Sequence, residues 1–354
     1  MNRAVTRSLV VAAIASLAAC ATDPVPMRFE ANGSEGRVWP APQTQEVPRY
    51  RYIGQLTGEA NFKPPAAEPG TFTRALQWIV GLAEREPDPL VLQRPQSGTV
   101  DARGRVLVTD VSRAAVFVFD EAGGRLDLWE RAGAGQRFVA PIGIVAGRSG
   151  EVLVADAELR SVVRLNAEGQ PIGEIGSGLL KRPTGLARDA KQGRIFVADT
   201  HDHDIKVFDD DGRLLDRWGA RGDTEGQLNF PTHLAWAQDR LYVTDAINAR
   251  VQTFDGFGQP LAAIGRRGLY VGNLVRPKGV ATDDEGNVYV VESMHDTLLV
   301  FDAQARLLLA IGGTGPDVGR FYLPAGVWVD ARNRIYVADM FNGRVVVFQF
   351  LGGG

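Results

Sequence analysis

The chain has 354 residues, of which 45% are hydrophobic, so it can bury a large core, and disorder throughout is excluded. Its 39 basic and 42 acidic residues give a net charge of −3, which provides no polybasic field for nonspecific nucleic-acid binding; nucleic acid is not an expected partner. The single cysteine, Cys20, excludes an internal disulfide framework and a cysteine-ligated structural zinc site.

The N-terminus has the layout of an export signal. Arg3 and Arg7 precede an uninterrupted run of apolar and small residues, 9–19, which ends at Cys20. This run is much shorter than the roughly 20 residues that span a bilayer as a helix, so residues 1–19 are expected to be removed and no transmembrane helix is expected. Leu17-Ala18-Ala19-Cys20 resembles the bacterial lipobox, in which cleavage precedes a cysteine that receives lipid.

The lipobox resemblance implies an address. It predicts a lipid on Cys20 that attaches the chain to a bacterial membrane, and Ala21 stands where an aspartate would favour retention in the inner membrane. The periplasmic side of the outer membrane is therefore the predicted location. The lipidated cysteine opens a segment, 20–49, with five prolines and few apolar residues, which predicts a flexible tether.

One sequence unit recurs along the rest of the chain. The unit is built of a Pro-x-Gly segment, a β-branched strand ending in an acid, a second apolar strand, a Phe-Asp-x-x-Gly type of turn and a last strand. The strand-ending acids are separated by 46, 43, 46, 47 and 47 residues; they are Asp110, Asp156, Asp199, Asp245, Glu292 and Asp339. A period of this length with about four short strands indicates the blades of a β-propeller.

In the third copy the pattern predicts strands at 183–187, 194–199, 205–208 and 214–218. The sixth copy ends without an outer strand, and Tyr50–Gly54 matches the outer-strand pattern of Pro260–Gly265. Residues 50–56 are therefore predicted to complete the sixth blade and close the ring, which hides the sheet edges. The predicted fold is all-β: a six-bladed β-propeller over 94–351, closed by an N-terminal strand, with a short helical insertion at 57–93 over one face.

The insertion contains one predicted helix. Thr71 is a suitable N-cap, and apolar residues follow at helical spacing until Pro87; they are Phe72, Ala75, Leu76, Ile79 and Ala83. The helix is either a lid over the face that carries the Pro-x-Gly segments or an amphipathic element packed on the propeller edge.

Two stretches carry a family resemblance. Gly226–Pro231 before an inner strand, and Val243–Arg250 at a strand end, resemble the NHL repeat, and the similarity recurs over residues 94–350. Copies one and two depart from it, with Arg113 and Leu159 at the position where the repeat has asparagine. The resemblance implies a propeller that acts as an interaction platform.

All four histidines, His201, His203, His233 and His295, are predicted to lie on the face of the Pro-x-Gly segments. His233 replaces the glycine of that segment in the fourth copy, so its ring should project toward the central channel. With Glu292 the four histidines form a candidate ligand-binding set, and His233, His295 and His201 could hold a divalent metal such as zinc or calcium. The alternative is that these histidines are solvent-facing loop residues, because no compact metal motif is present.

The strand-ending acids have a simpler interpretation. Each could bond the backbone of its own loop or pair with the arginine five residues on, as Asp245 with Arg250 and Asp339 with Arg344. A structural role in every blade is therefore expected.

Two functions remain open at this stage. The sequence has no nucleophile motif, phosphate-binding glycine loop or redox pair, which favours a noncatalytic, lipid-anchored module that binds a protein, peptide or glycan and needs no cofactor. The alternative is a metal-dependent lyase or hydrolase at the central channel, distantly similar to peptidyl-hydroxyglycine lyase.

Overall fold

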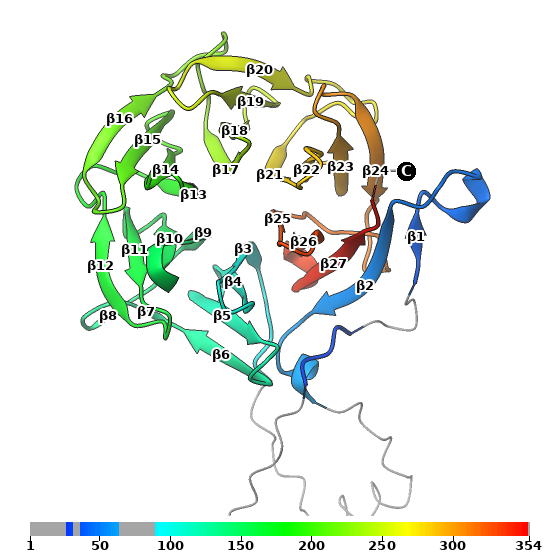
Figure 1. Cartoon of the computed structure of the whole chain (residues 1–354), viewed down its shortest axis with the longest axis horizontal. Coiled ribbons are helices and arrows are strands. Elements are labelled where there is room, and N and C mark those ends of the chain that lie inside the picture. The colour runs from blue at the N-terminus through cyan, green and yellow to red at the C-terminus, as the bar shows by residue number, and fades with distance from the viewer. Residues whose placement is uncertain (1–25, 31–35, 64–88, 353–354) are drawn as a thin grey trace, which may run out of the picture.

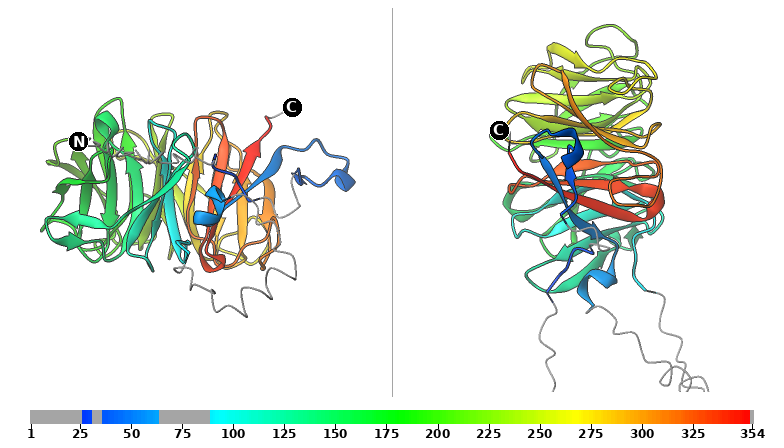
Figure 2. Two further views of the ribbon diagram at one scale, coloured as in Figure 1. Left: turned by 90° about the horizontal axis from the view of Figure 1, so that it is seen from below. Right: turned by 90° about the vertical axis from the view of Figure 1, so that its right-hand side faces the viewer.

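The computed structural model describes residues 26–30, 36–63 and 89–352. Six antiparallel sheets stand around a central axis, and seen edge-on they form a flat disc (Figures 1 and 2). The prediction of an all-β, six-bladed propeller is confirmed. In the described part of the chain the helices are short 3-10 turns: η1 (Pro42–Thr44), η2 (Glu59–Phe62), η3 (Arg148–Gly150) and η4 (Met340–Asn342).

Each of the first five blades is a four-stranded sheet in chain order from hub to rim. Blade one has β3 (Pro95–Val100), β4 (Val106–Asp110), β5 (Ala115–Asp120) and β6 (Arg125–Trp129); blade two has β9 (Pro141–Ala146), β10 (Val152–Asp156), β11 (Ser161–Leu165) and β12 (Pro171–Ile175). Blade three has β13 (Pro183–Asp189), β14 (Arg194–Asp199), β15 (Asp204–Asp209) and β16 (Leu214–Trp218); blade four has β17 (Pro231–Ala237), β18 (Arg240–Asp245), β19 (Arg250–Phe254) and β20 (Pro260–Ile264). Blade five has β21 (Pro277–Thr282), β22 (Val288–Glu292), β23 (Thr297–Phe301) and β24 (Leu307–Gly312). A small hairpin, β7 (Arg131–Gly133) and β8 (Gln136–Arg137), lies between blades one and two.

Blade six joins the two ends of the chain. It contains β25 (Val327–Val329), β26 (Arg334–Asp339) and β27 (Arg344–Phe350), followed outward by β2 (Tyr50–Leu56) and β1 (Val38–Trp39). Strand β2 pairs antiparallel with β27, with Tyr50 opposite Phe350 and Leu56 opposite Val345. The predicted closure by an N-terminal strand is thus confirmed, and it gives the last blade the outer strand that its own repeat lacks.

The segment before β2 differs from the predicted flexible tether. Within residues 26–30 and 36–49, β1 adds a fifth strand to blade six, and Glu30 forms an antiparallel bridge with Gln55. Trp39 packs edge-on against Phe348 at 5.4 Å, and Met27 is buried beside Leu56. The composition is poor in apolar residues, but the edge of β2 and the apolar rim of blade six supply hydrogen bonds and burial that a tether would not have alone.

Most of the predicted insertion lies outside the described residues. This includes the expected helix from Thr71 and the residues up to 88; the lipobox with Cys20 also lies outside. At the flanks, Gly58 bridges Val91, and the fully buried side chain of Asn61 bonds the backbone of Thr57, Gly58, Gln55 and Arg28. The part of the chain that the structure describes contains no helix long and apolar enough to cross a membrane.

The inner strands approach each other closely around the hub. A Cβ atom added at Gly143, Gly185 or Gly326 would clash with the backbone of the next inner strand, so only glycine fits there. Side-chain hydroxyls bond across the blades: Thr109 donates to the carbonyl of Ile142 (2.6 Å) and Thr244 to that of Lys278 (2.6 Å). The start of each inner strand is thereby fixed against its neighbour.

The core lies between the blades. One cluster, for example, joins Phe196 and Trp218 of blade three to Leu241 and Phe254 of blade four, and another joins Tyr289 of blade five to Phe348 of blade six. Each sheet buries its faces against the next, so every blade depends on both neighbours.

The aromatic cluster at the closure should contribute strongly to stability. Phe348 is fully buried and contacts Trp39, Tyr52 and Phe321, so Phe348→Ala is expected to lower the free energy of unfolding by about 3–5 kcal/mol. Phe257→Ala, at a phenylalanine that is 85% exposed, is the matched control and should change it by less than about 0.5 kcal/mol. Denaturant unfolding measures both, and equal effects would contradict the role of the closure cluster.

Candidate functional site

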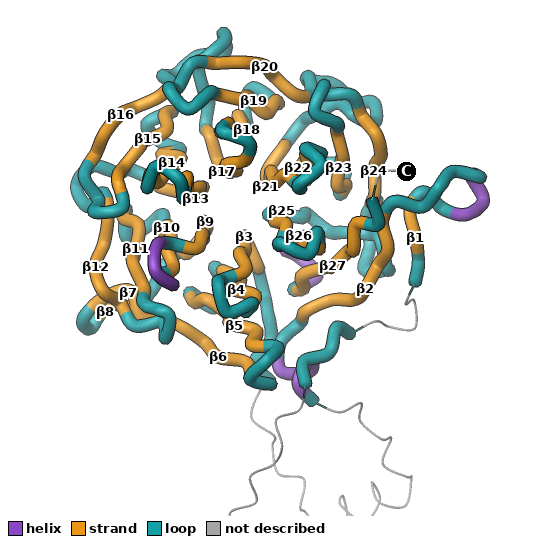
Figure 3. Tube along the Cα trace, viewed as in Figure 1, coloured by secondary structure: helices purple, strands orange, loops and turns teal. Residues whose placement is uncertain are grey.

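The antiparallel order within each blade separates two faces. The starts of the inner strands, the loops from second to third strand and the loops from outer strand to the next inner strand share one face, here called the top face. The hairpins between third and outer strands and the loops between inner and second strands share the bottom face. Figure 3 traces these strands and loops from hub to rim.

The six strand-ending acids hold the top face together. All are fully buried, and in blade three the carboxylate of Asp199 accepts the backbone N–H groups of Lys181 and Arg182, both at 2.8 Å. Asp110 and Asp156 accept equivalent N–H groups just before the inner-strand prolines, and also N–H groups of the loops that follow them. Asp110 and Asp156 therefore fix the loop before the inner strand against the loop after their own strand.

The expected arginine partners are also present. Arg250 lies 2.9 Å from Asp245, and Arg344 lies 2.8 Å from Asp339, so the structural interpretation of these acids is confirmed. Glu292 has the same role in blade five, because its carboxylate accepts N–H groups from Val275, Arg276 and Met294. The Glu292 side chain is fully buried and both of its oxygens are hydrogen-bonded, so neither faces the channel unpaired.

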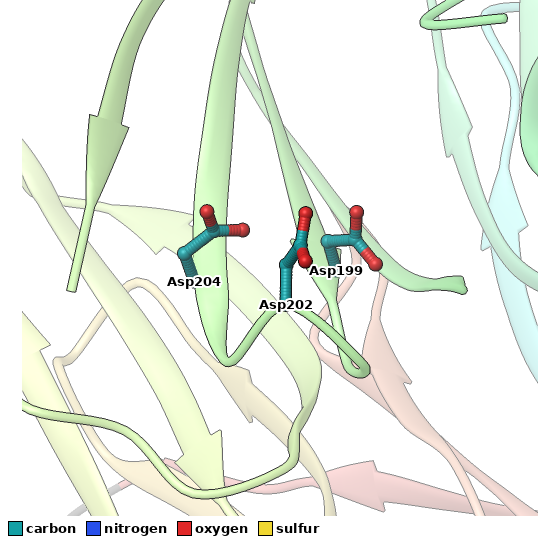
Figure 4. A group of neighbouring side chains, drawn as sticks. All are labelled: Asp199, Asp202 and Asp204. Carbon is teal, nitrogen blue, oxygen red and sulfur yellow. The ribbon is translucent and has the colours of Figure 1, made fainter. Parts of the chain in front are cut away.

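Blade three has a charge cluster that the sequence reasoning missed. The carboxylates of Asp199, Asp202 and Asp204 gather at the loop between β14 and β15 (Figure 4). Within the described residues they are the one group of three possible metal ligands with atoms within 4.8 Å of one another. The ammonium group of Lys206 bonds all three, at 2.6, 2.7 and 3.0 Å.

The ammonium group of Lys206 therefore occupies the position that a metal ion would take among these carboxylates. Burial opposes its charge, but hydrogen bonds to the three carboxylates raise its pKa above the ordinary value. Burial likewise opposes the charge of Asp202, whose pKa is nevertheless lowered by hydrogen bonds from Lys181 and Lys206. In blade four the corresponding positions hold Asp245, Asn248, Arg250 and Gln252. Blade three thus has the acid Asp204 where blade four has Arg250, and Lys206, two residues later, supplies the compensating positive charge.

The four histidines lie on the top face but do not assemble into one site. The described residues do not bring His201, His233 and His295 together as a ligand set, so the predicted metal centre is not formed by them. His203 accepts the N–H of Phe230 at its Nδ1 (3.2 Å), and its ring packs edge-on to Phe230 at 4.6 Å. Burial, with the charges of Arg221 and His201, lowers the pKa of His203. His201 is exposed and His295 is half-buried.

His233 has a different environment. It lies on β17, and both ring nitrogens are buried without a hydrogen-bond partner, as is the hydroxyl of its neighbour Thr232. Burial, reinforced by the positive charge of Lys278, lowers the pKa of His233 to about 3. The imidazole is therefore neutral at neutral pH and unsatisfied, which is costly in a folded protein.

The lower part of the channel is a cavity of about 210 Å³ lined by inner-strand residues of all six blades, from Ser97 in blade one to Val329 in blade six. Its top end holds a group of cations that the sequence reasoning did not single out. Lys278 is half-buried at the start of β21, and Arg94 and Arg276 are exposed just before β3 and β21. Burial, with the charges of Arg276 and Arg94, lowers the pKa of Lys278. A comparison of the residue after each inner-strand proline would have singled out Lys278 from the sequence. At that position the other blades have Gln96, Ile142, Thr184, Thr232 and Ala325.

Large exposed hydrophobic side chains collect in the top-face loops. They are Val139, Leu179, Phe230, Ile247, Leu269, Tyr270, Val271, Met294, Tyr322 and Phe341, each between 37% and 84% exposed. The bottom-face loops are rich in aspartates that bond their own turns, such as Asp101, Asp209 and Asp302; among the described residues their large exposed apolar side chains are Phe257, with Val47 and Leu351 at the rim. Contiguous apolar surface on one face of a protein is typical of interaction sites.

One top-face loop stands out by internal comparison. Residues 269–271 are Leu-Tyr-Val, 80%, 84% and 78% exposed. The equivalent loops before blades four and six have Asp223-Thr224-Glu225 and Pro316-Asp317-Val318, with the same backbone bonds: Gln227 N–H to Thr224, Asn273 N–H to Tyr270 and Arg320 N–H to Asp317. The fold therefore does not require apolar residues in this loop.

Comparisons with known proteins agree with this architecture. The NHL repeat family model matches residues 180–208, which cover the inner three strands of blade three. The chain therefore carries a recognisable NHL repeat in blade three of its six-bladed β-propeller. It is 40% identical over 74 residues to human NHL-repeat-containing protein 4 and 40% identical over 65 residues to the Drosophila melanogaster protein brain tumor. These matches cover 21% and 18% of this chain, and 58% and 6% of the relatives.

Solved structures share the propeller fold of this chain. A streptogramin B lyase has a TM-score of 0.55 at 13% identity, over 73% of this chain and 94% of that one. A chain from a nidogen/laminin complex has a TM-score of 0.52 at 17% identity, over 69% of this chain and 84% of that one. At these identities the likeness extends to the fold alone.

His233 should make stability pH-dependent. The pKa of His233 in the folded protein is lowered from 6.5 to about 3. Below pH 6.5 the unfolded chain therefore binds a proton that the folded chain does not, and the protein becomes less stable as the pH decreases. Between pH 7 and pH 5 the wild type should lose about 2 kcal/mol of unfolding free energy relative to His233→Gly, the residue that Gly185 and Gly279 provide in neighbouring blades. Urea unfolding of both proteins at the two pH values tests this, and parallel pH curves would contradict the burial of the neutral ring.

Proposed function

We propose that this chain is a noncatalytic binding module that holds a protein or peptide partner on the top face of its propeller. The observation that carries the proposal is the concentration of exposed apolar side chains on that face, opposite a bottom face of charged turns. Burying such side chains against a partner contributes about 1.5–3 kcal/mol each, which supports a specific interface.

The Leu269-Tyr270-Val271 loop is the sharpest place to test the proposal. The variant Leu269→Asp, Tyr270→Thr, Val271→Glu carries the sequence that the chain itself uses at 223–225 on the same loop backbone, so the fold should accept it. We expect it to weaken the affinity for a top-face partner at least tenfold, because three desolvated apolar contacts are lost.

The measurement is crosslinking capture from a periplasmic extract, followed by titration of the captured protein against the purified variants. Phe257→Ser removes an equally exposed apolar residue from the bottom face and should leave the affinity unchanged. A partner that binds the loop variant at full strength but loses the Phe257 variant would place the interface on the bottom face and overturn the proposal.

We also propose that a lipid on Cys20 carries this module at the periplasmic side of a bacterial outer membrane. The support is the sequence itself: two arginines, an 11-residue run of apolar and small residues and a lipobox-like end at the chain's single cysteine. A diacylated N-terminus gives stable anchoring, and the propeller would then be displayed in the periplasm.

Metabolic labelling with a clickable palmitate analogue tests the anchor in cells that express the full chain. The wild type should incorporate label and fractionate with the outer membrane, whereas Cys20→Ser should do neither, because no other thiol is available for modification. His295→Ser serves as the control substitution. Unlabelled wild-type protein in the soluble fraction would contradict the anchor.

A further inference from the structure

The end of the channel on the top face carries positive charge without a matching acid. Within the described residues, none of the side chains of Arg94, Arg276 and Lys278 takes part in an ion pair. The acids at the ends of the second strands of these two blades, Asp110 and Glu292, are fully buried, and their carboxylate oxygens accept hydrogen bonds from backbone N–H groups. By contrast Lys181 and Arg182, at the same height in blade three, are paired with Asp202 and Glu158.

Unsatisfied polar groups lie beside one of these cations, Lys278. His233 and Thr232 of β17 are next to Lys278 of β21, since the two inner strands are neighbours in the ring (Figure 1). Both imidazole nitrogens and the Thr232 hydroxyl are buried without a partner. A neutral imidazole carries one N–H donor. An anionic acceptor placed beside His233 and Lys278 would therefore receive a hydrogen bond from the imidazole and have its charge balanced by the ammonium group.

Aromatic side chains flank Arg94. The guanidinium of Arg94 lies 5.5 Å from the ring centroid of Phe341, which in turn is 5.5 Å from the ring of Tyr322. Both rings are nearly half exposed, at 49% and 46%. We refer to Arg94, Arg276, Lys278, Tyr322 and Phe341 as the mouth cluster.

We propose that the mouth cluster is a carboxylate-binding site, which receives an acidic side chain of a docked peptide that is flanked by apolar residues. The carboxylate lies among Lys278, Arg94 and Arg276, where it neutralises charges that repel one another, and the apolar neighbours of the acidic residue pack on Tyr322 and Phe341. This inference rests on the proposed docking function and names the chemistry of its partner.

The test uses the full chain purified in detergent and two labelled probe peptides with blocked ends, Leu-Phe-Glu-Phe-Leu and its glutamine twin, Leu-Phe-Gln-Phe-Leu. Fluorescence anisotropy should show the glutamate peptide binding at least tenfold more tightly than the twin. Lys278→Met keeps the length of the side chain and removes its charge, so it should abolish this difference. Lys191→Met makes the same change on the bottom face and should preserve it. Arg94→Met is a second variant and should reduce the difference.

Several outcomes would overturn the inference: equal affinity of the two peptides, no binding of either, or a preference for glutamate that survives in Lys278→Met. Competition with inorganic phosphate distinguishes the source of the anion. If phosphate binds only when Lys278 is present and the protein does not discriminate between the two peptides, the ligand of the site is a free anion and the acidic peptide is ruled out. The loop variant at 269–271 is read out with a different partner and leaves Arg94, Arg276 and Lys278 unchanged, so docking could stand although the carboxylate site failed.

Discussion

The buried carboxylate at the end of each second strand is the interaction on which the rest of the propeller depends. It accepts backbone N–H groups from the loop that enters the inner strand, as Asp199 does from Lys181 and Arg182. In blades one, two and five it also accepts N–H groups from the loop that follows its own strand. These donors would otherwise be buried or solvated at the most crowded point of the ring, where inner strands touch at glycine positions. Because every blade repeats the bond to the loop that enters its inner strand, the inner-strand starts are fixed and the channel mouth has a defined shape. Glu292 performs the same task with a longer side chain, so it belongs to the framework.

A rigid framework of this kind frees other positions to vary. The backbone of the loops before blades four, five and six is the same, yet the tips change from Asp-Thr-Glu to Leu-Tyr-Val to Pro-Asp-Val. Likewise, the residue after the inner-strand proline is lysine in blade five alone, and the position after that is histidine in blade four alone. These deviations are not needed for folding, and the unsatisfied ring of His233 carries a stability cost. Function is expected where single blades depart from an otherwise self-consistent repeat, as at residues 269–271, Lys278 and His233.

Blade three shows how the same framework accommodates a change of charge. Where blade four pairs Asp245 with Arg250, blade three has Asp199 and Asp204, and the ammonium of Lys206 restores the balance among three carboxylates. The cluster has the ligand types of a metal site but already contains its cation. The channel mouth is the opposite case, since its cations form no ion pair with any residue that the structure describes, and this contrast separates a structural charge cluster from a candidate binding site.

The architecture could be predicted from the amino-acid sequence alone. The 43–47 residue period, the four strand patterns per unit and the missing outer strand of the sixth copy were enough to predict the blades and their closure by Tyr50–Leu56, because those patterns are local and repeated six times. The structural role of Asp245 with Arg250 was predictable for the same reason. Which side chains meet between blades became visible only in three dimensions. There, His201, His233 and His295 do not converge, Lys206 neutralises three acids, Val38–Trp39 extends blade six, and Arg94 of blade one adds to the positive charge around Lys278 of blade five. Contacts of this kind depend on the rotation of one blade against the next, and no local pattern in the chain encodes it.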